Sequence, residues 1–343
     1  MPHFEPTVDL KSTLPISLRL SIVVPVFNEG MVIRQTAAAL LTAFEILPAQ
    51  WQVVFVNDGS CDGSPAILDE LVAIEPRFAV IHLARNFGHQ MAVTAGLDLV
   101  ECDAAVVMDA DLQDPPQVVA QMVQQFYAGA DMVLAVRRKR ESDGWFKRIS
   151  AALFYWVLRQ GHKQSCGENA GDFRLYSARA LTVMRAMREE HRYLRGMADW
   201  AGLTKAWVEY DRPPRAGGEA KYTLKKMLAL AWTALISFSG GQALLIGYVA
   251  AGVLTLGGLL AFLGMVIDYE YWQILLLMGV QILLTGIVLL SLAVLTDYAS
   301  RAYSESKRRP LYLVDRIQNL AVPELVPPRV VILPEANRRP PVP

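Results

Sequence analysis

Residues 104–116 read AAVVMDADLQDPP, and this stretch decides the fold. Its apolar beginning predicts a buried strand, and the proline pair at its end opens a helical pattern. Asp109 and Asp111 are two residues apart, so they leave the strand pointing the same way. Two carboxylates so placed repel each other unless a cation neutralises them. The stretch therefore predicts a cation site at the end of a buried strand, with a solvated acidic turn as the alternative.

The same order of apolar strand, polar cluster and helix occurs on both sides of this stretch. Strands are predicted at Leu20–Val26, Trp51–Asn57, Ala79–Leu83, Ala104–Asp109 and Met132–Val136. Helices are predicted at Val32–Ile46, Ser64–Ile74, Gln90–Val100 and Pro116–Tyr127. This alternation predicts an α/β fold, with a mostly parallel, Rossmann-like sheet and helices on both faces. In such sheets ligands bind beyond the carboxyl ends of the strands.

Polar clusters directly follow four of these strands. They read PVFNE at 25–29, NDGS at 57–60, RNFG at 85–88 and DADLQD at 109–114. Each alone is ordinary turn chemistry, but together they line one edge of the sheet. The oxygens of Asp109, Asp111 and Gln113 suit Mg²⁺ or Mn²⁺. Such an ion holds a pyrophosphate and stabilises the charge on a leaving nucleotide diphosphate.

Two further carboxylates are candidates for holding a nucleoside. Asp58 ends the second strand, where its oxygens can accept hydrogen bonds from a base N–H. Glu29 can do similar work near the ribose or base. A plain capping role is the alternative for both residues.

The C-terminal part of the chain has the composition of membrane segments. Hydrophobic residues make up 53% of the 343 residues, and residues 227–267 carry no charge. We predict an interfacial amphipathic helix at 223–241 and transmembrane helices at 242–267 and 271–296. Lys and Arg flank the pair, whereas the turn between the spans carries only acids. The positive-inside rule then predicts a multi-pass protein of the cytoplasmic membrane, with both termini cytoplasmic. A buried soluble helical pair is the alternative.

The remaining segments complete the predicted organisation. They are an N-terminal extension at 1–17, a cytoplasmic catalytic domain at 18–222 and a cytoplasmic tail at 297–343, Pro-rich and disordered after 320. The formal net charge is zero, so no basic field for nucleic acid is expected. Gly247 and Ala251 form a small-xxx-small pair that suits a homo-oligomer through the spans, with lipid-facing small residues as the alternative.

The motifs together resemble the inverting family-2 glycosyltransferases with a GT-A fold. The resemblance rests on VPVFNE at 24–29, NDGSCDGS at 57–64 and DADLQDPP at 109–116. RNFGHQ at 85–90, DFRL at 172–175 and RAGGEAKY at 215–222 narrow it to one branch. That branch contains the dolichol-phosphate mannose synthases and bactoprenol glucosyltransferases, whose bacterial members often carry two C-terminal spans.

The resemblance implies a role for each matching residue. Asp109, Asp111 and Gln113 would bind the metal and the donor diphosphate. Pro25, Glu29 and Asp58 would hold the nucleoside. Arg212 or Arg215, with Lys221, would close over the diphosphate. Asp172 would orient the acceptor or stabilise the developing sugar cation, and pairing with Arg174 or Arg215 is its alternative.

The implied acceptor is a polyprenyl phosphate, which is largely dianionic at neutral pH and needs no strong general base. Arg137 and Arg148 are the candidates for its phosphate, with ordinary surface charge as the alternative. We expect transfer of a hexose from UDP-glucose to this lipid with inversion, for modification of a cell-envelope glycan. GDP-mannose is the alternative donor. A processive polysaccharide synthase and a non-catalytic nucleotide-binding membrane scaffold are the competing classes.

Overall fold

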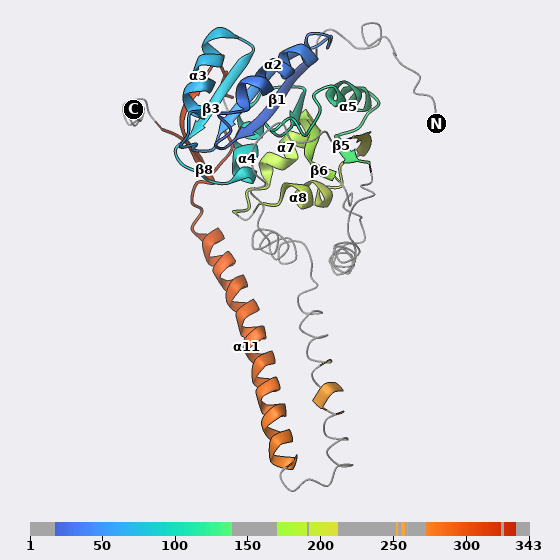
Figure 1. Cartoon of the computed structure of the whole chain (residues 1–343), viewed down its shortest axis with the longest axis vertical. Helices are drawn as coiled ribbons and strands as arrows, with labels where there is room; N and C mark the ends of the chain where they lie inside the picture. The colour runs from blue at the N-terminus through green and yellow to red at the C-terminus, as the bar shows by residue number, and fades with distance from the viewer. Residues whose placement is uncertain are drawn as a thin grey trace. The chain divides into compact units, whose positions relative to one another are not determined.

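The computed structural model describes residues 18–138, 170–190, 192–211, 272–323 and 326–333, with residues 252, 255–257 and 259. The chain divides into two compact units. The sheet unit comprises 1–142, 166–221 and 309–343, and the helix unit comprises 143–165 and 222–308. The described strands all belong to the sheet unit (Figure 1).

Strands and helices alternate along the sheet unit, as the hydrophobic pattern predicts. The strands are β1 Arg19–Val26, β2 Gln50–Asn57, β3 Phe78–Leu83, β4 Ala104–Val107, β5 Met132–Arg137, β6 Ala170–Ser177, β7 Lys205–Tyr210, β8 Tyr312–Gln318 and β9 Val330–Ile332. The helices are α2 Ile33–Phe44, α3 Ser64–Ile74, α4 His89–Leu99, α5 Val118–Tyr127, α7 Ala178–Ala186 and α8 Leu194–Trp200. All five predicted strands and all four predicted helices are present, with ends shifted by a few residues.

The strands form one sheet of order β7-β5-β6-β4-β1-β2-β3-β8-β9. β1 is parallel to β2 and β4, and β2 is parallel to β3. β6 runs antiparallel to β4 and β5, and β8 runs antiparallel to β3. The prediction of a mostly parallel sheet is therefore confirmed. The sequence did not predict the reversed strand β6 between β4 and β5, nor the reversed strands β8 and β9 at the edge. Because β1 to β4 run in one direction, their carboxyl ends meet at the same edge.

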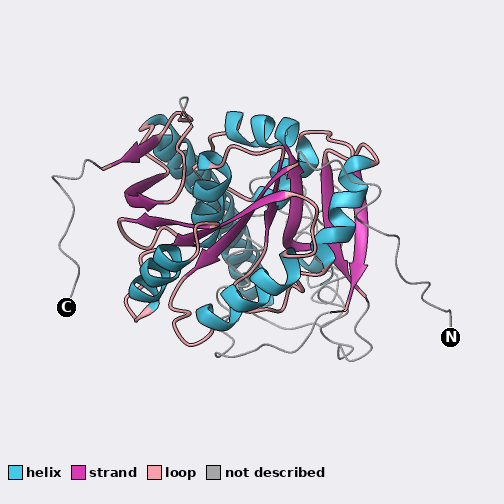
Figure 2. Ribbon diagram, turned by 90° about the horizontal axis from the view of Figure 1, so that it is seen from above, coloured by secondary structure: helices cyan, strands magenta, loops and turns pink. Residues whose placement is uncertain are grey.

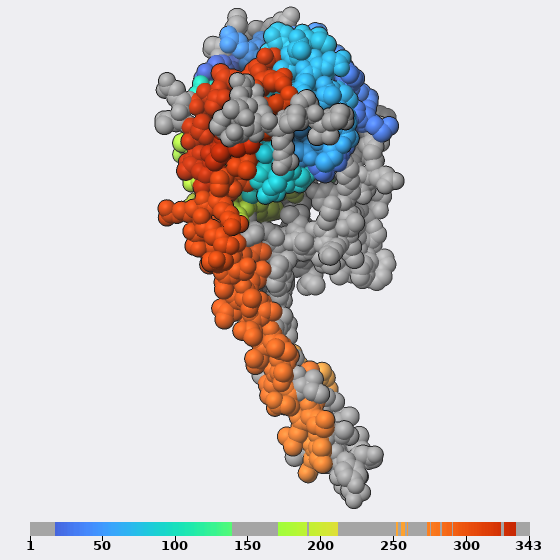
Figure 3. All heavy atoms as spheres, turned by 90° about the vertical axis from the view of Figure 1, so that its left-hand side faces the viewer, coloured from blue at the N-terminus to red at the C-terminus, as the bar shows by residue number. Residues whose placement is uncertain are grey.

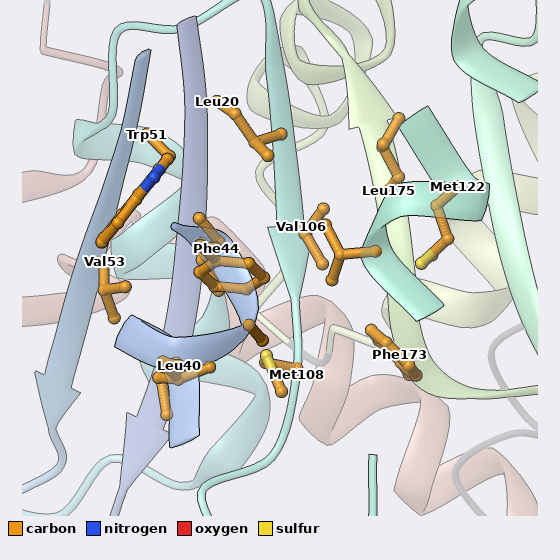
Figure 4. Packing of buried hydrophobic residues seen from close by; sticks show 14 of the residues in the cluster. Leu20, Leu40, Phe44, Trp51, Val53, Val106, Met108, Met122, Phe173 and Leu175 are labelled. Carbon is orange, nitrogen blue, oxygen red and sulfur yellow. The ribbon is translucent and has the colours of Figure 1, made fainter. Parts of the chain in front are cut away.

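Helices cover both faces of this sheet (Figure 2). On one face, side chains of β1, β2 and β4 pack with α2, α3 and α5 in the main core, where Phe44 and Met122 are fully buried (Figure 4). On the other face α4 approaches β1 very closely. A Cβ atom on Gly96 would lie 2.2 Å from Cγ1 of Val23, so this approach requires glycine. The tight α4 packing fixes the loop that precedes the helix.

The chain returns to the sheet after the helix unit. β8 pairs with β3 (Figure 1), and β9 pairs with β8. In Figure 3, atoms of the C-terminal segment (red) lie beside atoms of the N-terminal half of the chain (blue and cyan). Both strands lie in the segment 297–343 that was predicted to be a tail outside the catalytic domain, and β9 lies in the part that was predicted to be disordered after 320. β3 offers an unpaired edge, and Leu311, Tyr312 and Val314 become buried when the tail covers it. The sheet unit is therefore completed by residues that follow the helix unit in the sequence.

A β-bulge lets side chains of β8 contact helices on both faces of the sheet. The register shifts between His82 and Leu83, which turns the side chains on either side of the shift to opposite faces. Before the shift, the buried Tyr312 hydroxyl donates to Oδ2 of Asp98 in α4 over 2.9 Å. Beyond it, Arg316 donates to Oδ2 of Asp69 in α3 over 2.5 Å. The returning strand is thus fastened to both helical layers.

The helix unit contains α11, Trp272–Ser306, 35 residues long. Its part Leu276–Ser306 contains an 18-residue window with a mean hydropathy of 2.3, and it is the one helix within the described residues long and apolar enough to cross a membrane. At about 1.5 Å per residue it exceeds the roughly 30 Å of a hydrocarbon core. The predicted span at 271–296 falls almost wholly on α11. The predicted interfacial helix at 223–241 lies outside the described residues, as does most of the span at 242–267, so both stay predictions.

Candidate active site

The loops after β1 and β2 are locked together at the carboxyl edge of the sheet. The Asn28 amide donates to Oγ of Ser60 over 3.0 Å, and the Cys61 amide donates back to Oδ1 of Asn28 over 2.9 Å. The Glu29 amide donates to Oγ of Ser64 over 3.0 Å. Asn28 has a φ of 54°, a left-handed conformation that Asn tolerates better than most residues. These hydrogen bonds join the loops after β1 and β2 into one rigid surface.

Asp58 holds the loop after β3 against these two loops. Its buried carboxylate accepts from the Phe87 amide over 2.7 Å and from the Gly88 amide over 2.9 Å. Burial raises the pKa of Asp58, and the two backbone bonds act against that rise. Gly59 has a φ of 63°, and a Cβ atom there would lie 2.4 Å from the Arg85 carbonyl carbon. Each Asp58 oxygen retains acceptor capacity, so contact with a nucleoside stays a proposal.

The acidic loop after β4 is held by its own backbone. The Gln113 amide donates to Oδ1 of Asp111 over 3.1 Å, and the Asp109 amide donates to Oδ2 of Asp114 over 3.2 Å. Asp111 is only 6% exposed, whereas the Asp109 side chain is 36% exposed. Burial and the Asp109 charge raise the pKa of Asp114 to about 6. The loop therefore concentrates negative charge beside the edge of the sheet.

The donor atoms in this loop suit a hard divalent cation. Within the described part of the chain, no three His, Cys, Asp or Glu side chains lie close enough to hold a metal by themselves. Mg²⁺ commonly takes only one or two protein carboxylates and completes its shell with water and substrate phosphates. Asp109 and Asp111 could supply two such carboxylates. A bound cation would also reduce the repulsion between the carboxylates of Asp109 and Asp114.

The antiparallel strand β6 brings Asp172 to the same edge. Arg195 of α8 donates from Nε to Oδ1 over 2.8 Å and from Nη2 to Oδ2 over 3.1 Å. Gln90 donates to Oδ2 over 3.4 Å. Nε2 of His89 lies 3.5 Å from Oδ2 of Asp172 and 3.9 Å from Oδ1 of Asp109. His89 thus bridges the predicted metal-binding aspartate and the predicted catalytic aspartate.

Electrostatics keep Asp172 ionised. Burial acts to raise its pKa, but hydrogen bonds from His89 and Arg195 outweigh burial and hold the pKa well below the usual range. Burial likewise acts to lower the pKa of His89, and the Asp172 bond and the Asp109 charge outweigh it, so that pKa is raised. The partner of Asp172 is Arg195 instead of Arg174, which donates to the Gly171 carbonyl. Asp172 therefore holds the side chains of Arg195 and His89 in place and is a poor proton acceptor.

Arg137 is the last residue of β5, which pairs with the strand that carries Asp172. Its Nε donates to the Tyr210 hydroxyl over 3.3 Å, and its guanidinium lies against Gly171. Pro25 lies in β1, opposite Val56 of β2. The other predicted site residues, Arg148, Arg212, Arg215 and Lys221, lie outside the described residues.

Several residues of the site were missed from the sequence. They are His89, Gln90, Asp114, Arg195 and Tyr210. The RNFGHQ motif contained a signal for the first two, and the acidic cluster contained Asp114 itself. Arg195 lies 23 residues beyond its partner on a short helix, so no local pattern identifies it. Tyr210 lies 96 residues beyond Asp114 and reads only as a strand residue.

The comparisons with known proteins relate the chain to glycosyltransferases. The profile of the family described as "Glycosyl transferase family 2" matches residues 21–183. The uncharacterized glycosyltransferase YkcC of Bacillus subtilis is 39% identical over 307 residues, which cover 87% of this chain and 94% of that protein. The bactoprenol glucosyl transferase of Shigella phage SfV is 34% identical over 310 residues, which cover 87% and 98%.

A more distant likeness is to a solved glucosyl-3-phosphoglycerate synthase of Mycobacterium tuberculosis, in complex with Mn²⁺, UDP-glucose and phosphoglyceric acid. It has a TM-score of 0.46 and 14% identity, and covers 64% of this chain and 78% of that chain. This likeness is too distant to assign a ligand. The two relatives, each matched over nearly its whole length, decide the family. The chain is a glycosyltransferase that belongs to glycosyltransferase family 2.

Proposed function

We propose that this enzyme transfers a hexose from a nucleotide-diphosphate sugar to a polyprenyl phosphate, with inversion, at the cytoplasmic face of a membrane. The proposal rests on one observation. The acidic loop after β4, the loop after β3 that Asp58 holds, and Asp172 with its partner Arg195 lie at one edge of the sheet. The same chain contains a helix long enough to cross a membrane. The name of the phage relative, a bactoprenol glucosyl transferase, supports the lipid acceptor and glucose. UDP-glucose is the proposed donor.

The acidic loop is the proposed donor diphosphate site. Asp109 and Asp111, with the side-chain oxygen of Gln113, would hold Mg²⁺ or Mn²⁺. When bound, the ion stabilises charge on the departing nucleotide diphosphate. Pro25, Glu29 and Asp58 line the proposed nucleoside site. Arg212 or Arg215, with Lys221, keeps the proposed role of closing over the diphosphate.

The acceptor phosphate needs charge relief more than proton removal. Its dianion is already a nucleophile at neutral pH, so no general base has to be ionised first. The low pKa of Asp172 fits this chemistry, because the cluster offers fixed charges in place of a base. Arg137, with Arg148, is proposed to bind the phosphate. Asp172 would then act by orienting His89 and Arg195 toward the sugar.

A panel of labelled nucleotide sugars tests the reaction. Membranes containing the enzyme should yield organic-extractable, lipid-linked label from UDP-glucose, and membranes with Asp111→Asn should set the background. Long polyprenyl phosphates should be used much faster than short water-soluble analogues. Label from GDP-mannose alone would overturn the donor assignment and preserve the reaction class. Lipid-linked label from none of the donors would contradict the reaction class.

The pairing of β8 with β3 supports the proposed topology. Two strands of one sheet lie on the same side of any membrane, so the chain between them crosses an even number of times. α11 would supply one crossing, and the second would fall between 212 and 271, where the span 242–267 is predicted. Both crossings would then place the acidic turn 268–270 on the far side, as the positive-inside rule predicts.

Reporter fusions test this topology. A reporter in the turn 268–270 should face away from the cytoplasm, and tags at both termini should face it. A reporter after Gly129, an exposed loop of the sheet unit, provides the cytoplasmic control. A C-terminal tag on the opposite side from the Gly129 reporter would contradict the two-span arrangement.

A further inference from the structure

Tyr210 places a buried hydroxyl between Asp114 of the acidic loop and Arg137. It is the last residue of β7 and is only 4% exposed. Its ring meets the ring of Phe173 edge-on, with centroids 5.7 Å apart. In the sheet its register partner is Arg137 of β5. The strand pairing and the ring contact therefore fix where the phenol oxygen lies.

The hydroxyl links two groups of opposite charge. It donates to Oδ1 of Asp114 over 2.9 Å and accepts from Nε of Arg137 over 3.3 Å. The second oxygen of Asp114 accepts from the Asp109 amide over 3.2 Å. A continuous path of three hydrogen bonds thus runs from the backbone of the acidic loop to Arg137.

The geometry at Arg137 suits a phosphate ligand. Tyr210 engages Nε and not the two Nη groups. A Cβ atom on Gly171 would lie 3.3 Å from Nη2 of Arg137, so the guanidinium lies against the residue that precedes Asp172 in β6. Guanidinium groups bind phosphate best when their planar fork is fixed in advance. A side chain as long as arginine loses that advantage when nothing restrains it.

We propose that Tyr210 is a positioning residue that holds Arg137 ready for the acceptor phosphate and ties it, through Asp114, to the loop that carries Asp109. This assignment rests on the proposed function, because it takes Arg137 as a ligand of the lipid phosphate. It also links the two proposed binding sites. The acidic loop, proposed to bind the donor diphosphate, and Arg137, proposed to bind the acceptor phosphate, are joined by one path of hydrogen bonds.

Tyr210→Phe tests the assignment, since it removes the hydroxyl and keeps the ring contact. The KM for polyprenyl phosphate should rise about tenfold, in keeping with the loss of a hydrogen bond to a charged group. The KM for the nucleotide sugar should change less than about twofold. Tyr312→Phe is the matched control, because that buried hydroxyl also donates to a carboxylate over 2.9 Å but lies at β8. It should leave both KM values unchanged.

A double-mutant cycle separates positioning from a general structural role. In an Arg137→Ala background, Tyr210→Phe should have little further effect on the acceptor KM. An equal effect in both backgrounds, or no effect on acceptor KM in the single variant, would overturn the assignment. A Tyr210→Phe protein that does not fold would overturn it too, because a positioning role predicts that the fold survives. Failure of the proposed function would show differently, as absence of lipid-linked product from the wild type.

Discussion

Replacing Asp111 with Asn is expected to lower kcat for sugar transfer about a thousand-fold. An amide at this buried position can still accept from the Gln113 amide, so the loop should keep its shape while losing one negative charge. The remaining carboxylate of Asp109 would have to hold the cation against a diphosphate alone. Metal stabilisation of a leaving group contributes several kcal/mol, and each lost increment of about 1.4 kcal/mol is a tenfold loss in rate. Transfer measured in purified membranes across a series of Mg²⁺ and Mn²⁺ concentrations gives the size of the effect.

The matched control is Asp103→Asn, which removes a surface carboxylate paired with Arg19 and should leave transfer unchanged. EDTA should silence the wild type, and added Mg²⁺ or Mn²⁺ should restore it. Undiminished transfer in EDTA would remove the metal from the mechanism. Near-normal transfer by the Asp111 variant, with metal dependence intact, would move the metal site elsewhere.

The first part of the fold could be predicted because its signals are local. β1 to β5 are runs of apolar residues, and the helices between them repeat apolar residues at helical spacing. Parallel strands joined by helices then place the loops at one edge, so the acidic pair and Asp58 were found from sequence. The metal site itself remains a prediction.

The rest of the sheet depends on contacts that no local window contains. β6 reads AGDFRLYS, in which charged and small residues hide the strand, and its antiparallel place between β4 and β5 is set by pairing. β8 reads YLVDRIQ and lies in a segment that composition marks as a tail. Its Arg316 reaches Asp69 across 247 residues of sequence. Only the assembled sheet reveals these partners.

The same distinction explains the site. Asp172 was found by its motif, but its proposed role rests on its contacts with Arg195 and His89, which a short helix and the start of α4 bring to it. The sequence left Arg174 and Arg215 as its possible partners. Arg174 lies two residues from Asp172 in β6, so the two side chains point to the same face of the sheet. Arg174 nevertheless donates to the Gly171 carbonyl, and the arginine that pairs with Asp172 comes from α8.

Ending the chain after Arg309 is expected to abolish transfer and destabilise the sheet unit. The deletion removes β8 and β9, leaves the edge of β3 unpaired and exposes the surface that covers Tyr312 and Val314, both fully buried. Because β8 follows α11 in the chain, the sheet cannot be completed until the helix unit has been synthesised. A catalytic domain cut at residue 222 would therefore lack part of its own fold.

Tyr312→Ala gives a graded form of this prediction. It empties a fully buried aromatic site and removes the hydrogen bond to Asp98, which also pairs with Arg188 over 2.8 Å. Such a change costs about 3–5 kcal/mol, a large share of the roughly 5–15 kcal/mol that stabilises a domain. Val331→Ala in β9, where the side chain is 38% exposed, is the control and should change stability little. Thermal unfolding in detergent, followed by tryptophan fluorescence, should show a clear fall in Tm for Tyr312→Ala. A truncated chain that unfolds at the wild-type temperature and still transfers sugar would show that β8 only covers the edge, without stabilising the sheet.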